Sequence, residues 1–137
     1  INYFFDCDVT GIEINERYYQ EALYNKINYM KKKPSSEDKI HFVCTLAQQY
    51  KISDKDNKFY FFNPFSVEIF ASVLNNIFDS YDRKPRDIDI IMYYPSESYI
   101  DYLEYFTPFM KSQEVILKDL YEKDNQEKFL IYSLKCY

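Results

Sequence analysis

The chain has 137 residues, of which 47% are hydrophobic and 28% charged, as in ordinary soluble globular domains, so we expect one domain spanning residues 1–137. A formal net charge of -5 at pH 7 argues against broad binding to nucleic acid backbones, which requires clustered Lys and Arg. The longest apolar runs are far below the roughly 18 residues that a membrane-spanning helix needs, so no membrane association is expected.

The first half of the chain predicts a strand, a helix and a second strand. Residues 1–5 are too short to define an element, whereas Asp8–Ile14 is a short apolar stretch typical of a strand. Asn15 can cap a helix that runs to about Lys32. After the break at residues 33–36, Ile40–Cys44 predicts the second strand. The helix is expected to bury one apolar stripe, formed by Tyr19, Ala22, Leu23, Ile27 and Met30.

The second half predicts two more strands, each followed by a helix. Phe59–Phe62 and Ile88–Tyr94 are almost wholly apolar, as expected of strands that helices cover on both faces. Ser66 and Ser96 are candidate caps for the two helices that follow. Residues 79–87 predict a charged turn between the first of these helices and the strand after it.

The end of the chain changes character. Glu114–Tyr121 and Lys128–Leu134 are two strand-like runs joined by a polar stretch, which indicates an antiparallel hairpin. The whole order therefore predicts an α/β sheet with an antiparallel end.

The composition offers little to hold a metal ion. Cys7, Cys44 and Cys136 are widely scattered in apolar surroundings, so we interpret them as reduced core thiols. His41 is the single histidine and lies in a predicted strand, where a structural role is expected. We therefore predict no metal site. The chain begins without an initiator Met or a secretory signal, and a cytoplasmic location is expected.

The segment Val9-Thr10-Gly11-Ile12-Glu13-Ile14-Asn15 suggests a nucleoside site. In doubly wound α/β proteins, an acid that ends a strand accepts hydrogen bonds from ribose hydroxyls, and Glu13 has that place. The structural alternative is a solvated acid at the entry to a helix. Gly11 is the only glycine, so the glycine-rich turn that normally precedes such a strand is absent.

Taken together, the elements resemble a class I S-adenosylmethionine-dependent methyltransferase that lacks its first strand and glycine-rich loop. The resemblance covers nearly the whole chain. It implies a Rossmann-like three-layer sandwich with a mostly parallel sheet, a C-terminal antiparallel hairpin and no first strand. It also implies that the chain is an N-terminally truncated part of the catalytic domain and is inactive alone.

The resemblance assigns cofactor-binding roles to residues after the first two predicted strands. Glu13 would accept both ribose hydroxyls of S-adenosyl-L-methionine, and Ile14 and Asn15 follow it, with Ile14 offering apolar contact to the adenine face. Ala47 and Gln48 lie where the family reads the adenine edge with a backbone amide and a polar side chain. The alternatives are that Gln49 has this role or that Gln48 is only a surface residue.

The resemblance also assigns a catalytic segment, Asn63-Pro64-Phe65. It is similar to the Asn/Asp-Pro-Pro-aromatic motif of methyltransferases that act on amino groups, in which an amide oxygen and a backbone carbonyl hold the target nitrogen while an aromatic ring stacks on a planar substrate. Such chemistry needs alignment rather than a nucleophilic side chain. Tyr94-Pro95 would lie beside the motif. The structural alternative is a strand-to-helix turn in which Asn63 and Pro64 serve backbone geometry.

Three functions are therefore open. The first is a methyltransferase whose acceptor is unknown, with a small molecule or a protein favoured over duplex nucleic acid. The second is a catalytically inactive Rossmann-like binding or interaction module, which could pair an open sheet edge with a second copy of itself. The third is another nucleotide-binding enzyme such as a dehydrogenase, against which the terminal hairpin and the Asn63-Pro64-Phe65 turn weigh.

Overall fold

The computed structural model describes residues 1–136, apart from the side chain of residue 37. The chain falls into two compact units, residues 1–50 and residues 51–137. That the whole chain forms one domain stays a prediction.

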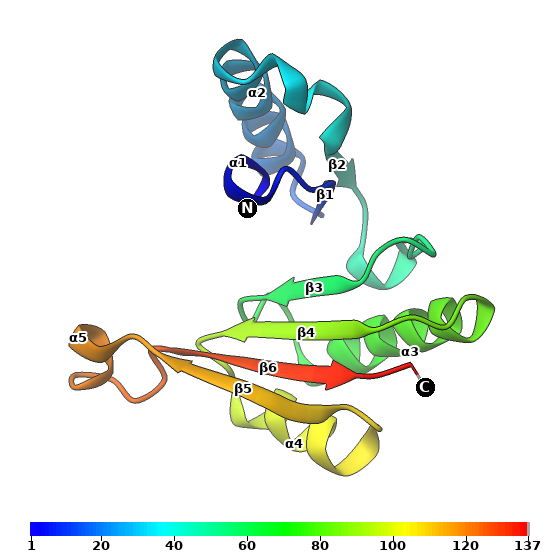
Figure 1. Ribbon diagram of the computed structural model, residues 1–137, viewed down its shortest axis with the longest axis vertical. Helices are drawn as coiled ribbons and strands as arrows, with labels where there is room; N and C mark the ends of the chain where they lie inside the picture. The colour runs from blue at the N-terminus through cyan, green and yellow to red at the C-terminus, as the bar shows by residue number, and fades with distance from the viewer. Residues whose placement is uncertain (137) are drawn as a thin grey trace. The chain divides into compact units, whose positions relative to one another are not determined.

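The first unit is a parallel strand pair with helices. Strands β1 (Val9–Glu13) and β2 (Ile40–Cys44) pair in parallel, with Val9 opposite Ile40 and Glu13 opposite Cys44. The helices and turns are α1 (Asn2–Phe5), α2 (Glu16–Lys32) and the 3-10 turns η1 (Pro34–Lys39) and η2 (Ala47–Gln49). Helix α2 is the crossover that joins the two parallel strands (Figure 1).

Helix α2 begins where the sequence predicts. The side chain of Asn15 accepts hydrogen bonds from the backbone N–H groups of Arg17 and Tyr18, so its capping role is confirmed. The apolar stripe is less buried than predicted. Ile27 is 54% exposed, and within α2 no described residue is fully buried.

The only glycine has a packing role. An added Cβ at Gly11 would lie 2.7 Å from two ring carbons of Phe42, its partner in the ladder of β1 and β2. Glycine therefore lets the Phe42 ring cover the first strand.

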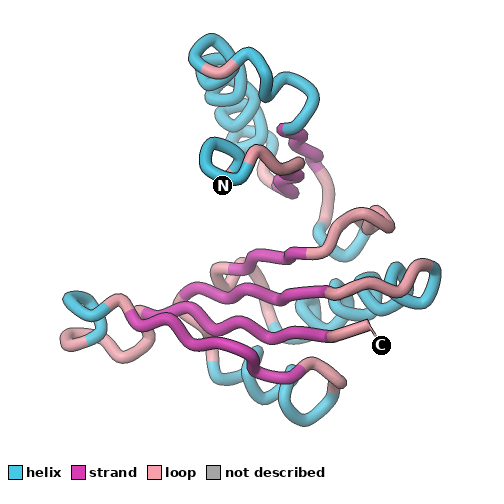
Figure 2. Tube along the Cα trace, viewed as in Figure 1, coloured by secondary structure: helices cyan, strands magenta, loops and turns pink. Residues whose placement is uncertain are grey.

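The second unit is a four-stranded sheet in the order β3-β4-β6-β5 (Figures 1 and 2). Its strands are β3 (Lys58–Phe61), β4 (Ile88–Tyr93), β5 (Met110–Ile116) and β6 (Lys128–Leu134). β3 and β4 pair in parallel, whereas β6 is antiparallel to both of its neighbours. Its helices are α3 (Val67–Arg83), α4 (Glu97–Phe106) and the single turn α5 (Lys118–Tyr121).

Helices α3 and α4 cover the same face of this sheet. The chain moves across the sheet in one direction from β3 to β4 to β5, and right-handed crossovers then place both connecting helices on one side. Their contact is direct, because the rings of Phe70 in α3 and Tyr99 in α4 stack with centroids 3.9 Å apart. The core lies between this helix pair and the inward-facing residues of the sheet, which include Phe61, Ile88, Ile90, Met92, Leu130 and Tyr132.

The predicted fold class is wrong. The strands form two sheets, a parallel pair and a mixed four-stranded sheet with two antiparallel ladders, and not one mostly parallel Rossmann-like sandwich. The prediction counted both groups of strands as parts of one sheet, with the place of the absent first strand between the strands that end at Glu13 and Phe62. Among the described residues, no strand pairs β1 or β2 with β3, and in the second unit α3 and α4 lie on the same face of a mixed sheet.

Several local predictions also need correction. The predicted hairpin exists as β5 and β6, but β5 ends at Ile116, and residues 118–121 form a helical turn instead of strand. Helix α3 continues to Arg83 through most of the predicted charged turn. Ser66 and Ser96 occupy the N-cap positions of α3 and α4, yet neither side chain makes a cap hydrogen bond.

The cysteines are free, as predicted, but they are not core residues. Cys44 and Cys136 are exposed and Cys7 is partly exposed.

No helix within residues 1–136 is both long and apolar enough to cross a membrane.

Candidate functional site

Two places carry the predicted site residues, one in each unit. In the first unit, Glu13 ends β1 and its backbone carbonyl accepts a hydrogen bond from Thr45 N–H at 3.1 Å, which fixes the strand end. Its side chain folds toward the start of α2, where Oε1 accepts a hydrogen bond from Asn15 N–H at 2.7 Å. A carboxylate has about four lone-pair sites, so after this bond Glu13 can still accept hydrogen bonds from two hydroxyl groups of a ligand.

The two residues after Glu13 differ in what they offer a ligand. Ile14 is 64% exposed, so its side chain is open to an apolar surface. Asn15 uses Oδ1 for two backbone N–H groups of α2, at 3.0 Å from Arg17 and 3.4 Å from Tyr18. Its polar oxygen therefore belongs to the helix cap.

A cysteine and an acid lie at the same strand end. Cys44 ends β2, and its Sγ donates to Glu16 Oε2 at 3.3 Å. Hydrogen bonds from Gln20 and then from Cys44 hold the pKa of Glu16 below its usual value, and the bond to Glu16 raises the pKa of the Cys44 thiol. This thiol is thus poorly suited to act as a nucleophile.

Ala47 and Gln48 lie in η2, the turn that follows β2. Both are partly buried, and the turn is closed by a hydrogen bond from Tyr50 N–H to the carbonyl of Ala47 at 3.2 Å. Because β1 and β2 are parallel, η2 follows the same sheet edge that carries Glu13. The five predicted cofactor residues thus belong to one edge, that of the carboxyl ends.

In the second unit, Asn63 ties the end of β3 to the end of β4. Its Nδ2 donates to the backbone carbonyl of Tyr94, and its Oδ1 accepts from Ser96 N–H at 3.1 Å. Asn63 and Tyr94 both have a positive φ, of 40° and 49°. Asn visits this region more easily than most residues, whereas an aromatic residue there is unusual. Strain of this kind often marks a functional site.

The other two residues of the motif differ in exposure. Pro64 is exposed, whereas the Phe65 ring packs toward the core, 6.0 Å from the ring centre of Phe61. The Phe65 carbonyl accepts a hydrogen bond from the buried Tyr99 hydroxyl at 2.6 Å. Phe65 is therefore held from both its ring and its backbone.

An aromatic cluster beside Asn63 was missed by the sequence analysis, apart from Tyr94. The rings of Phe62 and Tyr93 lie 4.9 Å apart, and Tyr93 stacks on Phe129 at 4.9 Å. Tyr94 completes the group, 6.4 Å from Phe62. We call Phe62, Tyr93, Tyr94 and Phe129 the aromatic rim. The available signal was that two apolar strands each end on an aromatic residue followed within two positions by Pro.

Two carboxylates accept hydrogen bonds from the rim. Tyr93 OH donates to Glu127 Oε2, and Tyr94 OH donates to Asp124 Oδ2. These bonds raise the pKa of both tyrosines, and the bond from Tyr94 lowers the pKa of Asp124. Asp124 is therefore ionised at neutral pH. We call Asp124 and Glu127 the carboxylate pair.

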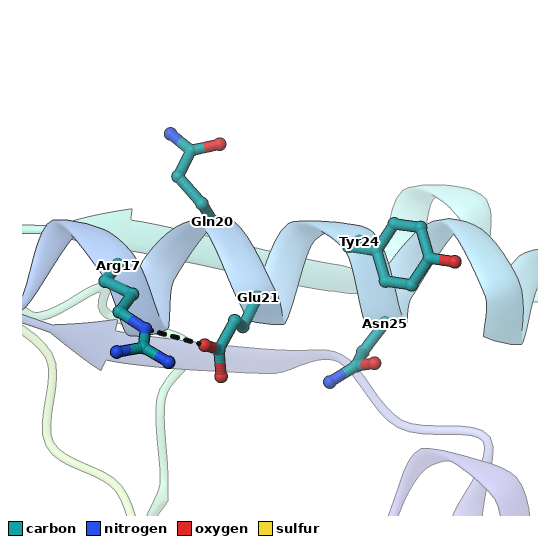
Figure 3. Close-up of a pocket in the computed structure, with 5 residues that line it drawn as sticks. All are labelled: Arg17, Gln20, Glu21, Tyr24 and Asn25. Carbon is teal, nitrogen blue, oxygen red and sulfur yellow. Dashed lines mark hydrogen bonds and ion pairs between the residues drawn. The ribbon is translucent and has the colours of Figure 1, made fainter.

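A shallow hollow runs along α2 and is separate from these residues. It is lined by side chains from one helix only, and Figure 3 shows them spread along its surface, with an ion pair of 3.2 Å between Arg17 and Glu21. The side chains do not converge on a common point (Figure 3). This hollow has the character of an exposed helix face and not of a binding cleft.

No protein-family model matches the chain, and comparisons with curated proteins and with solved structures give no match either.

Proposed function

We propose that the chain is part of an S-adenosyl-L-methionine-dependent methyltransferase. The observation that carries the proposal is Glu13, a partly exposed carboxylate at the carboxyl end of a parallel strand, held by Asn15 N–H and followed by the exposed Ile14. Ligands of α/β proteins gather at such strand ends.

The residues of the first unit fit the nucleoside part of the cofactor. Glu13 would accept the ribose hydroxyls, Ile14 would contact the adenine, and Ala47 and Gln48 follow the neighbouring strand at the same edge. Asn15 contributes indirectly, because its side chain caps α2 and its N–H orients Glu13. When bound, the cofactor supplies an electrophilic methyl group on a sulfonium.

The second unit supports an acceptor site at the ends of β3 and β4. Asn63 fixes the turn, and the exposed Pro64 follows it, so the backbone there is held in one geometry. A fixed backbone carbonyl and one remaining lone pair on Asn63 Oδ1 could accept hydrogen bonds from an amino group. The protein contributes to methyl transfer mainly by aligning the acceptor with the methyl group of the cofactor.

One observation favours a second function, a binding module without transfer activity. Both polar atoms of the Asn63 amide already have protein partners, Tyr94 and Ser96. In that reading Asn63 is a turn residue, and the chain keeps binding surfaces without catalysis.

Titration with S-adenosylhomocysteine tests the proposal, followed by the backbone amide shifts of the isotopically labelled chain. We expect changes at Glu13, Ile14 and Ala47. Glu13→Ala should weaken binding by about 1.5–3 kcal/mol, the range for a hydrogen bond to a charged group. Glu21→Ala, which removes an acid from the exposed face of α2, should leave binding unchanged. If the amide of Glu13 did not shift, or if Glu13→Ala bound S-adenosylhomocysteine as tightly as the parent chain, the site would be rejected.

A further inference from the structure

The aromatic rim and the carboxylate pair lie at one end of the four-stranded sheet. Phe62 follows β3, Tyr93 ends β4 and Tyr94 follows it, and Phe129 lies opposite Tyr93 in the β4–β6 ladder. The α5 segment, which precedes the carboxylate pair, lies at the same end as the arrowheads of β3 and β4 (Figure 1). Rings and carboxylates therefore form one surface, joined by the two tyrosine–carboxylate hydrogen bonds.

The rim is accessible. Phe62 is 57% exposed although its ring contacts Tyr93 and Tyr94, so part of its surface is open to solvent. The two tyrosines and Phe129 are partly exposed. Phe62 lies outside the core, and an exposed aromatic cluster held by its neighbours is available for binding at little cost in side-chain ordering.

The charge of this surface is negative. Asp124 and Glu127 face the tyrosine hydroxyls, and the nearby Lys128 turns to the other side of the hairpin, where its Nζ lies 3.0 Å from Glu114 Oε1. Aromatic faces carry negative electrostatic potential, so rings and carboxylates favour the same kind of ligand.

We infer that the aromatic rim and the carboxylate pair bind an alkylammonium group and, resting on the proposed function, that the methyl acceptor carries such a group. A cation over an aromatic face gains more when carboxylates lie beside it. A phosphate would be repelled by Asp124 and Glu127. An uncharged planar base would gain nothing from the charges of the two carboxylates that this surface carries.

Three small probes distinguish the ligand classes in the full chain. Nα-acetyl-lysine amide carries the ammonium, Nα-acetyl-norleucine amide is nearly the same shape without charge, and adenosine is planar and uncharged. The amide shift of Tyr94, whose N–H donates to the Lys128 carbonyl at 3.0 Å, reports binding at the rim. We expect the lysine amide to bind at least roughly tenfold more tightly than the other two, about the combined effect of a cation–aromatic contact at an exposed site and the charges of the two carboxylates beside it.

Two substitutions test the assignment without removing the core. Phe62→Leu and Glu127→Gln should each weaken binding of the lysine amide by roughly threefold to thirtyfold. Glu127→Gln keeps an acceptor for Tyr93 OH and removes the charge. The matched controls, Phe106→Leu at an exposed ring of α4 and Asp119→Asn in α5, should leave binding unchanged.

The outcomes separate this inference from the proposed function. Equal binding of the norleucine amide, tighter binding of adenosine, or no shift at Tyr94 with any probe would overturn it. If S-adenosylhomocysteine caused no amide shift at Glu13 in the parent chain, the methyltransferase would be rejected, and the rim would then be an ammonium site of a binding module.

Discussion

Replacing Asn63 tests whether this residue is a structural link between two strand ends. Asn63→Ala removes the hydrogen bonds to the Tyr94 carbonyl and from Ser96 N–H, and places Ala at a φ of 40°. Two neutral hydrogen bonds contribute about 1–3 kcal/mol and the left-handed conformation costs Ala about 1–2 kcal/mol. We therefore expect the free energy of unfolding to fall by about 2–4 kcal/mol, allowing for partial relaxation.

A glycine at the same position separates the two contributions. Asn63→Gly loses the same hydrogen bonds but adopts a positive φ without steric cost, so it should be about 1 kcal/mol less destabilising than Asn63→Ala. Asn125→Ala, at an exposed loop residue, is the control and should change stability by less than about 0.5 kcal/mol.

Urea unfolding followed by circular dichroism measures these differences, and hydrogen exchange of Ser96 N–H reports the link itself. That amide should exchange faster in both Asn63 variants, because its acceptor is gone. If Asn63→Ala were as stable as the parent chain and Ser96 N–H exchanged at the same rate, the structural link would be refuted.

Two further predictions concern packing and acid stability. Gly11→Ala should lower the free energy of unfolding by about 1–3 kcal/mol, because the added methyl group overpacks against the Phe42 ring. The same substitution should cost less in a Phe42→Leu background. An equal cost in both backgrounds would contradict this explanation. The hydrogen bond from Lys128 holds the pKa of Glu114 in the folded chain below its ordinary 4.5. The ion pair between the two residues therefore stabilises the fold above that pH, and this stabilisation is lost as the pH falls through the lowered pKa of the folded state. Urea unfolding between about pH 5 and pH 3 should show a smaller loss of stability in Glu114→Gln than in the parent chain; equal losses would show that the ion pair does not contribute.

Local features of the fold could be predicted because their causes are local. Asn15 caps α2 through bonds to residues only two and three positions away, and such a pattern is visible in sequence. Strand β2 has the predicted bounds, Ile40–Cys44, because an apolar run between polar breaks defines it. Strand pairing has no such local cause, so the grouping of all the strands into one mostly parallel sheet was assumed, and it proved wrong.

At the end of β5, by contrast, the prediction missed a local signal. Residues 117–121 do not alternate, because Leu117, Leu120 and Tyr121 recur at the spacing of a helix, and Lys118–Tyr121 form a helical turn. The β5–β6 ladder ends with Ile116 opposite Lys128. The helical spacing of the apolar residues after Ile116 therefore indicates the end of the strand in the sequence itself.

The candidate site was predictable as a list of residues and not as a set of contacts. Asn63 was found from its place before Pro64, but its partners Tyr94 and Ser96 lie 31 and 33 positions away. The carboxylate pair could not be found, because Asp124 and Glu127 meet the rim only through the path of the chain after β5.

The two interpretations of Asn63 are compatible once the turn is treated as part of the site. The bonds that occupy its amide fix the backbone at Tyr94, and Tyr94 in turn holds Asp124 through its hydroxyl. A residue that makes no contact with a ligand can therefore still set the geometry of the rim. If so, Asn63→Ala should weaken binding of the lysine amide at Tyr94 even though Asn63 itself offers no charge. If binding were unchanged in a destabilised Asn63→Ala, the turn would serve stability alone.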